Sequence, residues 1–373
     1  MDLVNLFMEF QKWNPSLIRY MGNCNHHAVA GDEIINPWHM CGDVWSHTCM
    51  VYRHFLNLVG NDTSNEHYFY TGIAILCHDI GKVHTRKVKE NNHVSFHSHP
   101  FASIQETIDF IYYLKRKGLI EDIEKVIYIV TNLVSNHIDF HNEKSLFAKW
   151  EYANRDENLF IANLLLNVCD DHGRISYKGN RILTYEDFQC YFLSALSILE
   201  AIGLDKIKHH NKKIVFLVGP PAAGKNTYLS NKTAVSFDDI RMEVYQRKND
   251  VDGMDNITLY KKAFEYCNEH KIDLTGLLVK KAKELLETED VVYINNVNMG
   301  RKARRSIINS LGKNYNYESI ILANTTQDLV MRNQYREDKK IPMGVLDKMM
   351  KNYQIPTYKE GFSKIEVKFN GIC

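Results

Sequence analysis

The sequence lacks several features that mark common classes of protein. None of its eight cysteines forms a CxxC pair, and their scatter favours reduced thiols over a disulfide-bonded scaffold. No apolar run is long enough to span a bilayer, and the N-terminus has no basic start of the kind that opens a signal peptide. The formal net charge is only +1, so a polyanion would have to be bound by local patches. These absences favour a cytoplasmic protein without a membrane partner.

What is present suffices for two domains. The chain has 373 residues, of which 45% are hydrophobic and 24% charged, as in globular proteins with well-filled cores. Apolar residues before about residue 204 recur at three- and four-residue steps, which predicts an all-helical domain. After residue 213, apolar strands alternate with helices, which predicts a parallel sheet flanked by helices. The predicted domains are therefore residues 1–204 and 214–373, joined by a charged linker over 205–213.

A glycine-framed loop near the middle of the chain indicates nucleotide binding. The apolar run 213–218 is followed by Gly-Pro-Pro-Ala-Ala-Gly-Lys-Asn-Thr, in which Gly219 and Gly224 permit the turns of a P-loop. Lys225 supplies a mobile charge for the β and γ phosphates of ATP or another nucleoside triphosphate. Asn226 stands where Ser or Thr usually binds Mg²⁺. Whether Asn226, Thr227 or a water molecule holds that metal is open.

Polar groups downstream of the loop suggest phosphoryl transfer. Asp238 follows a predicted strand, from which its carboxylate could accept the proton of an attacking hydroxyl, while Arg241 could pair with a phosphate of the acceptor. Arg332 and Arg336 are four residues apart, so on a helix they would share one face and both reach the transferring group. The basic residues of 301–305 could contact a nucleic-acid backbone or form a solvated helix face.

Histidines concentrate in the first half of the chain. An apolar helix is predicted to end at His78-Asp79, where an imidazole and a carboxylate can turn toward one cation. Such ligands accept manganese, iron, nickel, cobalt or zinc, and water bound to such a metal loses a proton near neutral pH. Lys82, close behind, could neutralise charge on a phosphate oxygen. The candidate ligands, all imidazoles or carboxylates, are His47, His78, Asp79, His99, His137 and Asp170.

The order of these ligands resembles the HD superfamily of metal-dependent phosphohydrolases, which is all-helical. The strings Gly-Asp-Val-Trp-x-His, His-Asp-Ile-Gly-Lys, Phe-x-x-His and Asp-x-x-Gly-Arg are similar to those of its nucleotidyltransferase-associated phosphatase branch, over about residues 36–174. The resemblance implies that a first metal is held by His47, His78, Asp79 and Asp170, and a second by His99 and His137 with Asp79 as the bridge. Asp171 is an alternative to Asp170.

The second half is similar to the phage-type polynucleotide 5′-kinases over about residues 214–353. The shared elements are the P-loop, Asp-Asp-x-Arg, Asn-x-Asn and Arg-x-x-x-Arg. The chain departs from that family at Asn226 and Asn296, where the family has Ser and Asp. The resemblance implies roles for the residues noted above: Lys225 binds ATP phosphates, Asp238 is the general base, Arg241 holds an acceptor phosphate, and Arg332 and Arg336 form a lid.

Together the two halves resemble the bifunctional HD-domain polynucleotide kinases of bacterial and viral nucleic-acid repair. The predicted enzyme removes 2′, 3′ or 2′,3′-cyclic phosphate from RNA or DNA ends and phosphorylates their 5′-hydroxyls, with RNA favoured. It would act in a bacterial or phage-infected cell, before an RNA ligase seals the ends. Two alternatives remain open: a nucleoside or nucleotide kinase fused to a nucleotide phosphohydrolase, and a nucleotide-binding sensor without turnover.

Overall fold

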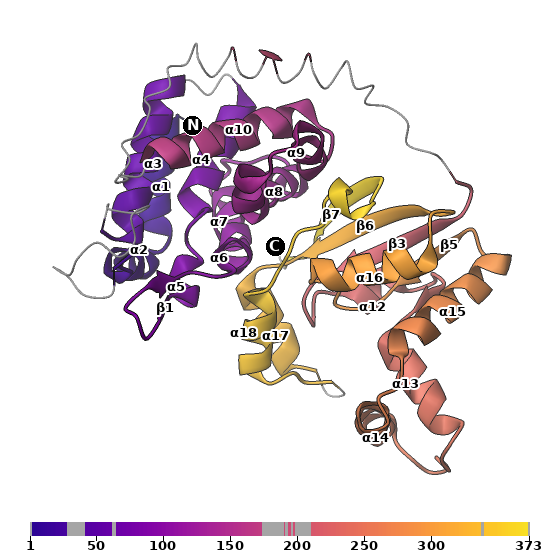
Figure 1. Cartoon of the computed structure of the whole chain (residues 1–373). Coiled ribbons are helices and arrows are strands. Elements are labelled where there is room, and N and C mark those ends of the chain that lie inside the picture. The colour runs from indigo at the N-terminus through magenta and orange to yellow at the C-terminus, as the bar shows by residue number, and fades with distance from the viewer. Residues whose placement is uncertain are drawn as a thin grey trace. The chain divides into compact units, whose positions relative to one another are not determined.

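The computed structural model describes residues 2–27, 42–61, 65–173, 210–336 and 339–371, with residues 190, 193, 194 and 197. Three sequence predictions fall outside these ranges: residues 36–41 of the phosphohydrolase resemblance, Arg174 at its end, and residues 205–209 of the linker. The chain forms two compact units (Figure 1). The helical unit comprises Met1–Lys206 with Met350–Lys359, and the sheet unit comprises Ile207–Met349 with Glu360–Cys373.

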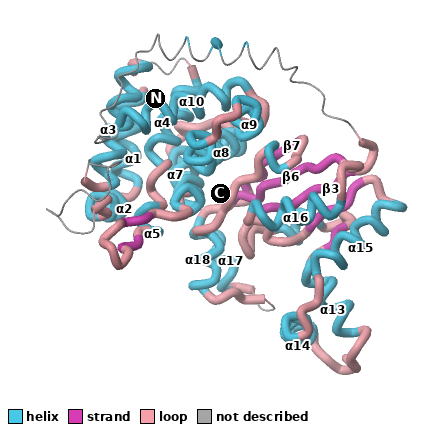
Figure 2. The backbone as a smooth tube through the Cα atoms, in the orientation of Figure 1, coloured by secondary structure: helices cyan, strands magenta, loops and turns pink. Residues whose placement is uncertain are grey.

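The helical unit is built from helices and one small antiparallel strand pair (Figure 2). Its helices are α1 (Leu3–Trp13), α2 (Pro15–Asn23), α3 (Val44–Val59), α4 (Glu66–Cys77), α5 (Lys82–Thr85), α6 (His99–Ala102), α7 (Ile104–Arg116), α8 (Ile123–Asn142), α9 (Leu146–Tyr152) and α10 (Glu157–Gly173). Its strands are β1 (Lys87–Val88) and β2 (Val94–Ser95). Among the described residues, no helix is both long and apolar enough to cross a membrane.

Helix α4 forms the centre of this unit because its last eight residues, from Tyr70 to Cys77, are all buried. Such a helix must be covered on every side, and α1, α3, α8 and α10 all pack against it. Small residues allow close approach: a Cβ at Gly72 would lie 3.1 Å from a Leu6 methyl, and a Cβ at Gly173 would lie 2.6 Å from the Cα of Val51. The second half of α4 is therefore enclosed by the other helices of this unit.

A segment from late in the chain belongs to the helical unit. Residues 350–359 lie between α18 and β7 of the sheet unit, yet they bury Tyr353, Ile355 and Thr357. The Ile355 amide donates to the Ser135 hydroxyl at 3.3 Å, two residues before the candidate ligand His137. A helical domain cut at residue 204 would lack this segment.

The sheet unit contains a parallel five-stranded sheet in the order β4-β5-β3-β6-β7. The strands are β3 (Lys213–Val218), β4 (Ala234–Val235), β5 (Val291–Ile294), β6 (Asn316–Ala323) and β7 (Lys364–Phe369). The helices are α12 (Lys225–Leu229), α13 (Phe237–Gln246), α14 (Asn256–Glu269), α15 (Leu274–Thr288), α16 (Arg301–Leu311), α17 (Thr326–Gln334) and α18 (Met343–Met350). The 3₁₀ turn η1 (Tyr358–Glu360) covers the end of the 350–359 segment and the first residue of the returning sheet unit.

These elements confirm the coarse sequence prediction of a helical first region and a parallel sheet with helices. β3 is central and apolar, because it pairs with β5 on one side and β6 on the other. The helical stretch over 256–288, before β5, consists of two helices, α14 and α15. α14 ends at Glu269, and the Asp273 carboxylate begins α15 by accepting from the Gly276 amide at 3.0 Å.

The 350–359 segment should contribute to the stability of the helical unit. Replacing Ile355, which is 2% exposed, by Ala is expected to lower that unit's free energy of unfolding by about 2–4 kcal/mol through the cavity it leaves. Urea unfolding followed by tryptophan fluorescence isolates this unit, since Trp13, Trp38, Trp45 and Trp150 all precede residue 206.

Ile257→Ala is the matched control, because Ile257 is 38% exposed on α14 of the sheet unit. It should leave the tryptophan transition unchanged. An unchanged transition in Ile355→Ala as well would show that the segment contributes nothing.

Candidate metal centre and nucleotide site

The turn after α4 places the first candidate ligands. His78 and Asp79 follow the last residue of the buried helix, and Gly81 comes two residues later. Gly81 is required by close packing, because a Cβ there would lie 2.1 Å from the His99 carbonyl oxygen. The Ser103 hydroxyl accepts from the Gly81 amide at 2.8 Å and donates to the His78 carbonyl at 3.1 Å. The glycine therefore lets α6, which begins with His99, approach Asp79.

The histidines of the site are oriented by backbone carbonyls. His78 Nδ1 lies 2.7 Å from Ile75 O, His99 Nδ1 lies 2.8 Å from Phe96 O, and His137 Nδ1 lies 2.7 Å from Val134 O. A carbonyl only accepts, so each Nδ1 carries the hydrogen and each Nε2 presents a lone pair. Metal-ligating histidines are held in this manner.

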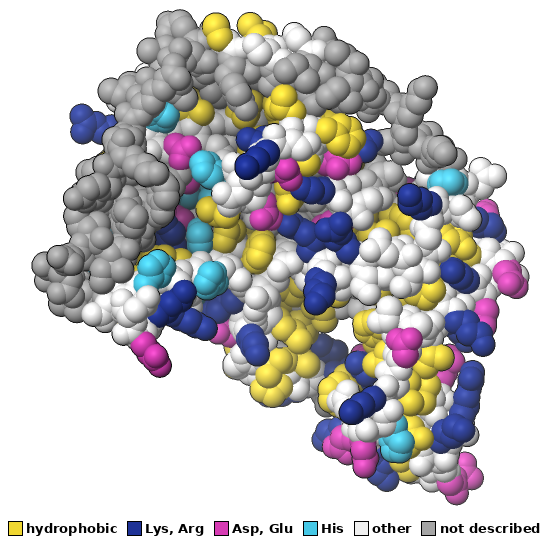
Figure 3. Space-filling model, in the orientation of Figure 1, with side chains coloured by type: hydrophobic (Ala, Val, Ile, Leu, Met, Phe, Trp, Pro, Cys, Tyr) yellow, Lys and Arg dark blue, Asp and Glu magenta, His cyan; other side chains and the backbone are white. Residues whose placement is uncertain are grey.

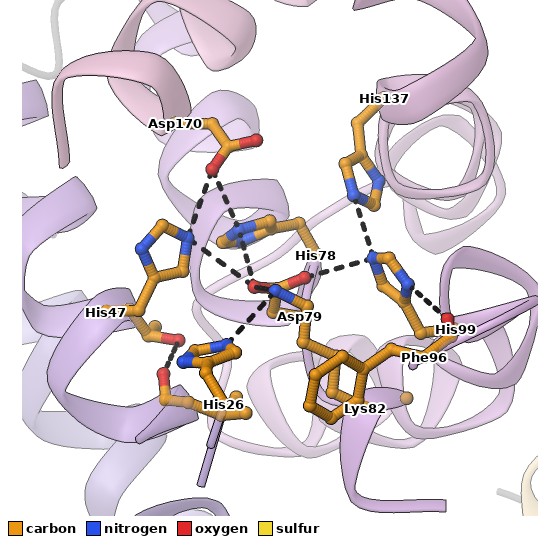
Figure 4. Close-up of polar contacts among 12 residues, drawn as sticks. His26, His47, His78, Asp79, Lys82, Phe96, His99, His137 and Asp170 are labelled. Atoms are coloured by element: carbon orange, nitrogen blue, oxygen red, sulfur yellow. Dashed lines mark hydrogen bonds and ion pairs between the residues drawn. The ribbon is translucent and has the colours of Figure 1, made fainter. Parts of the chain in front are cut away.

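These Nε2 atoms converge on the Asp79 carboxylate (Figure 4). Its Oδ2 lies 3.5 Å from His47 Nε2 and 3.4 Å from His78 Nε2, whereas its Oδ1 lies 3.1 Å from His99 Nε2. His99 Nε2 is in turn 3.3 Å from His137 Nε2. The two oxygens of one carboxylate thus face two different groups of imidazoles.

The site keeps the Asp79 carboxylate charged and the His137 imidazole neutral. Burial alone would raise the pKa of Asp79, but the Lys82 ammonium, 2.6 Å from Oδ2, and the nearby His78 and His99 hold that pKa well below its usual range. Burial lowers the pKa of His137 to about 3, helped by the neighbouring His99 and His78. Ionised carboxylate and neutral imidazole are the forms that bind metals.

The donor set fits divalent metal ions. Two groups, His47 with His78 and Asp79, and Asp79 with His99 and His137, each place one ligand atom per residue within 4.8 Å of the others. The buried Nε2 of His78 has no hydrogen-bond partner among the described residues, as expected of a nitrogen meant for a metal. Figure 3 shows several histidine side chains gathered on the visible face of the helical unit.

The structure distinguishes between neighbouring candidates. Asp170 Oδ1 lies 3.0 Å from His47 Nε2 and 3.8 Å from His78 Nε2, whereas the Asp171 carboxylate pairs with His141 at 3.5 Å. Asp170 is therefore the member of the adjacent acidic pair that lies beside two imidazoles of the first group. The six residues predicted from the sequence as ligands come together.

One residue of this centre was missed by sequence reasoning. His26 is fully buried, and its Nε2 lies 3.4 Å from Lys82 Nζ. It precedes the span of the phosphohydrolase resemblance, and no local spacing relates it to the other histidines. A histidine at that position carries no recognisable signal until the chain is folded.

The P-loop of the sheet unit follows β3. Gly219 must be small, because a Cβ there would lie 3.0 Å from the Leu322 carbonyl oxygen, and Gly224 adopts a positive φ of 86° before α12. Lys225 folds back, donating to Gly219 O at 2.9 Å and Pro220 O at 2.8 Å. Burial, and then the charge of Arg336, lower the pKa of Lys225 to about 7.

Amide side chains line the side of the P-loop where magnesium would bind. The Asn295 amide donates to Asn226 Oδ1 at 3.0 Å, so the residue at the usual Ser or Thr position is paired with a neutral group from the end of β5. Asn296 instead accepts from the Phe237 amide at 2.8 Å and positions α13. Asn298 donates to carbonyls of β3 and β5. The sequence pointed to Asn296, but Asn295 is the residue that faces Asn226.

Helix α13 presents one of its two adjacent acids. Ser236 caps the helix by accepting from the Asp239 amide at 3.1 Å, and its hydroxyl donates to the Asp239 carboxylate at 2.6 Å. Asp238 instead has Arg241 Nη1 3.0 Å from Oδ1 and Lys339 Nζ 3.1 Å from Oδ2. Lys339 is a further basic residue of this site that the sequence did not single out.

The two lid arginines do not share a helix face. α17 ends at Gln334, so it includes Arg332 but not Arg336. The Asn333 side chain, near the end of this helix, exchanges two hydrogen bonds with the backbone of Ile341, at 2.7 and 3.0 Å. Arg332 donates to Asn324 Oδ1 at 2.7 Å and to the carbonyl of Asn370, the residue after β7. The expected helical spacing of these arginines was wrong.

The basic stretch 301–305 is not uniformly available to a nucleic acid. Arg304 is fully buried and forms a two-pronged ion pair with Glu360, both contacts at 2.8 Å. Its Nη1 also donates to the Asn298 carbonyl at 2.8 Å. Arg304 therefore has a structural role, because the short helix α16 turns it toward the core and away from solvent.

Comparison with known proteins bears on the sheet unit. Residues 213–362 match the family model described as "Chromatin associated protein KTI12". The matched span begins at β3, contains the P-loop and covers less than half of the chain. It is consistent with a P-loop kinase-like domain that uses a nucleotide and Mg²⁺. No curated protein matches the chain.

Metal binding should follow the division of ligands between the two groups. We expect Mn²⁺ to bind to both groups in the unmutated protein, His137→Ala to lose one ion, and Asp79→Asn to lose both, because Asp79 belongs to each group. Metal content after dialysis and calorimetric titration would measure this.

His84→Ala is the matched control, since the His84 ring pairs with Glu106 at 2.6 Å, outside both groups. Its metal content should equal that of the unmutated protein. Full metal content in Asp79→Asn would contradict the shared-ligand arrangement.

Nucleotide binding should be coupled to proton uptake at Lys225. With a pKa of about 7 in the free protein, Lys225 is mostly neutral at about pH 8. Nucleotide phosphates raise the pKa of a nearby ammonium, so we expect an uptake approaching about one proton. Calorimetry in buffers of different ionisation enthalpy measures it. Lys225→Arg keeps its charge at this pH, so equal uptake by that variant would assign the proton elsewhere.

Proposed function

We propose that this chain is a bifunctional enzyme that heals broken nucleic-acid ends, RNA above all, before an RNA ligase joins them. In this proposal the helical unit hydrolyses 2′, 3′ or 2′,3′-cyclic phosphate ends and the sheet unit phosphorylates 5′-hydroxyls. The observation that carries the proposal is the Asp79 carboxylate, whose two oxygens face separate imidazole groups in a chain that also contains a P-loop. The ordered motifs in both halves support the same conclusion.

The helical unit has the groups that phosphoester hydrolysis needs. A manganese, nickel, cobalt, iron or zinc ion held there would lower the pKa of a water molecule, allowing it to attack phosphorus near neutral pH. Lys82 would neutralise charge on a phosphate oxygen. Attack on a cyclic phosphate breaks one ester bond and leaves a monoester. A second hydrolysis releases inorganic phosphate and a hydroxyl.

The sheet unit has the groups that a 5′-kinase needs. Lys225 would leave the P-loop carbonyls and bind the phosphates of ATP, while Mg²⁺ would neutralise charge on those phosphates. Asp238 would accept the proton of the 5′-hydroxyl while the hydroxyl oxygen bonds to the γ-phosphorus and ADP leaves. Arg241 would hold the neighbouring phosphate of the acceptor. Arg332 and Arg336 would cover the ATP phosphates from the lid.

A second candidate is favoured by one observation. The pairing of Asn226 with Asn295 puts neutral amides where a kinase normally places a metal-binding hydroxyl and a carboxylate. A site of this kind would suit a sensor that binds nucleotide without turnover. ATP binding without any phosphoryl transfer would identify that role.

The two activities should be separable by mutation. An RNA with a 5′-hydroxyl and a 2′,3′-cyclic phosphate would be incubated with ATP, Mg²⁺ and Mn²⁺, and its ends resolved by electrophoresis. We expect Asp79→Ala to slow end-phosphate removal alone, and Lys225→Ala to slow 5′-phosphorylation alone, each by about a hundredfold or more.

A control is available in each unit. Asp171→Ala removes an acid next to Asp170 that pairs with His141 at 3.5 Å, and Lys232→Ala removes a lysine that lies over the Tyr228 ring. Both should leave the two reactions unchanged. Equal efficiency on a mononucleoside without a 3′-phosphate would instead favour a small-molecule kinase fused to a nucleotide phosphohydrolase.

A further inference from the structure

His26 enters the metal centre from a part of the chain that carries none of its motifs. The residue lies in the short segment after α2, is fully buried, and packs edge-on against two rings. Its ring centroid is 6.1 Å from that of His47 and 5.5 Å from that of Phe96. Figure 4 shows it beside Lys82, close to Asp79. Burying an imidazole costs free energy of folding unless its nitrogen atoms form hydrogen bonds, so the contacts of His26 decide whether its position is favourable.

Hydrogen bonds fix the backbone of His26 and of the residues on either side of it. Arg86, which caps α5, donates from Nε to the Asn25 carbonyl at 2.8 Å and from Nη2 to the His27 carbonyl at 2.9 Å. The His26 amide donates to the Gly42 carbonyl at 2.8 Å. Arg86, the residue after the short helix that carries Lys82, therefore also fixes the segment that carries His26.

The contact between the two side chains assigns their roles. Lys82 Nζ lies 3.4 Å from His26 Nε2, and an ammonium can only donate. The His26 Nε2 is therefore the acceptor, and the ring is neutral. Burial, and then the charge of Lys82, lower the pKa of His26 to about 2, in agreement with a neutral ring.

Lys82 also contacts an oxygen that the metal ligands share. Its Nζ lies 2.6 Å from Asp79 Oδ2, the oxygen that faces His47 and His78. A divalent ion in that group would compete with the ammonium for this oxygen. His26 belongs to neither ligand group, so its nitrogen is a partner that Lys82 can keep. The Phe96 ring, 5.5 Å from Nζ, adds a cation–π contact.

We propose that His26 is a positioning residue of the phosphohydrolase site: it holds the Lys82 ammonium in place as a neutral acceptor, so that this charge faces the substrate phosphate. The inference rests on the proposed hydrolytic function of the helical unit. It adds to that function a residue that acts on phosphate through Lys82 and not through the metal.

The test is a double-mutant cycle on the Mn²⁺-loaded full chain. His26→Leu removes the acceptor at similar volume, and we expect it to raise the KM for the end phosphate about tenfold, with less effect on kcat. Lys82→Met should have at least as large an effect. The double variant should be no worse than Lys82→Met alone, because His26 acts through Lys82.

Two variants separate positioning from packing. His26→Gln places a carbonyl oxygen near the former Nε2 and should bring the KM most of the way back to that of the unmutated protein. His27→Leu changes the side chain of the next residue, whose backbone carbonyl is held by the same Arg86. This variant should leave the KM unchanged. Tryptophan fluorescence and Mn²⁺ content should match the unmutated protein in every variant.

Additive effects of His26→Leu and Lys82→Met would overturn the inference, as would a loss of Mn²⁺ by His26→Leu, which would make His26 a ligand. Affinity for inorganic phosphate, measured by calorimetry on the Mn²⁺-loaded protein, gives a readout independent of turnover. If the unmutated protein hydrolyses no phosphoester, the proposed function fails. His26 is then judged by phosphate affinity alone, where an unchanged value in His26→Leu would refute its role.

Discussion

The buried carboxylate of Asp79 is the charge around which the helical unit is arranged. A carboxylate that is 2% exposed must be balanced, and here the Lys82 ammonium lies 2.6 Å from its Oδ2. Gly81 lets His99 approach Asp79, because any larger residue would keep His99 away. Backbone carbonyls then turn the imidazoles so that their lone pairs face inward. The lysine thus balances the buried charge, and the imidazoles leave nitrogen lone pairs beside it that could bind a metal ion.

In the sheet unit, hydrogen bonds hold irregular backbone in place at the carboxyl ends of the parallel strands. Several of these hydrogen bonds are made by side-chain amides. Asn298 donates to carbonyls of β3 and β5, and Asn296 accepts from the first residue of α13. The buried Arg304–Glu360 pair ties α16 to the turn before β7. These contacts place the P-loop, Asp238 and Arg241 on a rigid framework, which phosphoryl transfer requires because most of its catalysis is positioning.

The side chains that gather around Asp79 could be named from the sequence because their residue types and order are specific even when they lie far apart. Predictions based on one helix face were less reliable. Arg336 lies beyond the end of α17, where Asn333 bonds to the backbone of Ile341, and Arg304 is buried although its neighbours are basic. His26 and Asn295 had no local signal at all. In each case, the deciding contact is made by a residue distant in the sequence or by a side chain bonding to backbone.

The sequence alone determined the helical first region, the parallel sheet, the P-loop and the set of candidate ligands, because periodicity and local spacing are properties of short segments. Tertiary structure decided which polar groups meet. Lys82 with His26, and Arg304 with Glu360, are each 56 residues apart, and nothing in the intervening sequence specifies either contact. Folding selects such pairs because a buried charge or imidazole must find a partner, and the packing of whole helices and strands settles which partner is within reach.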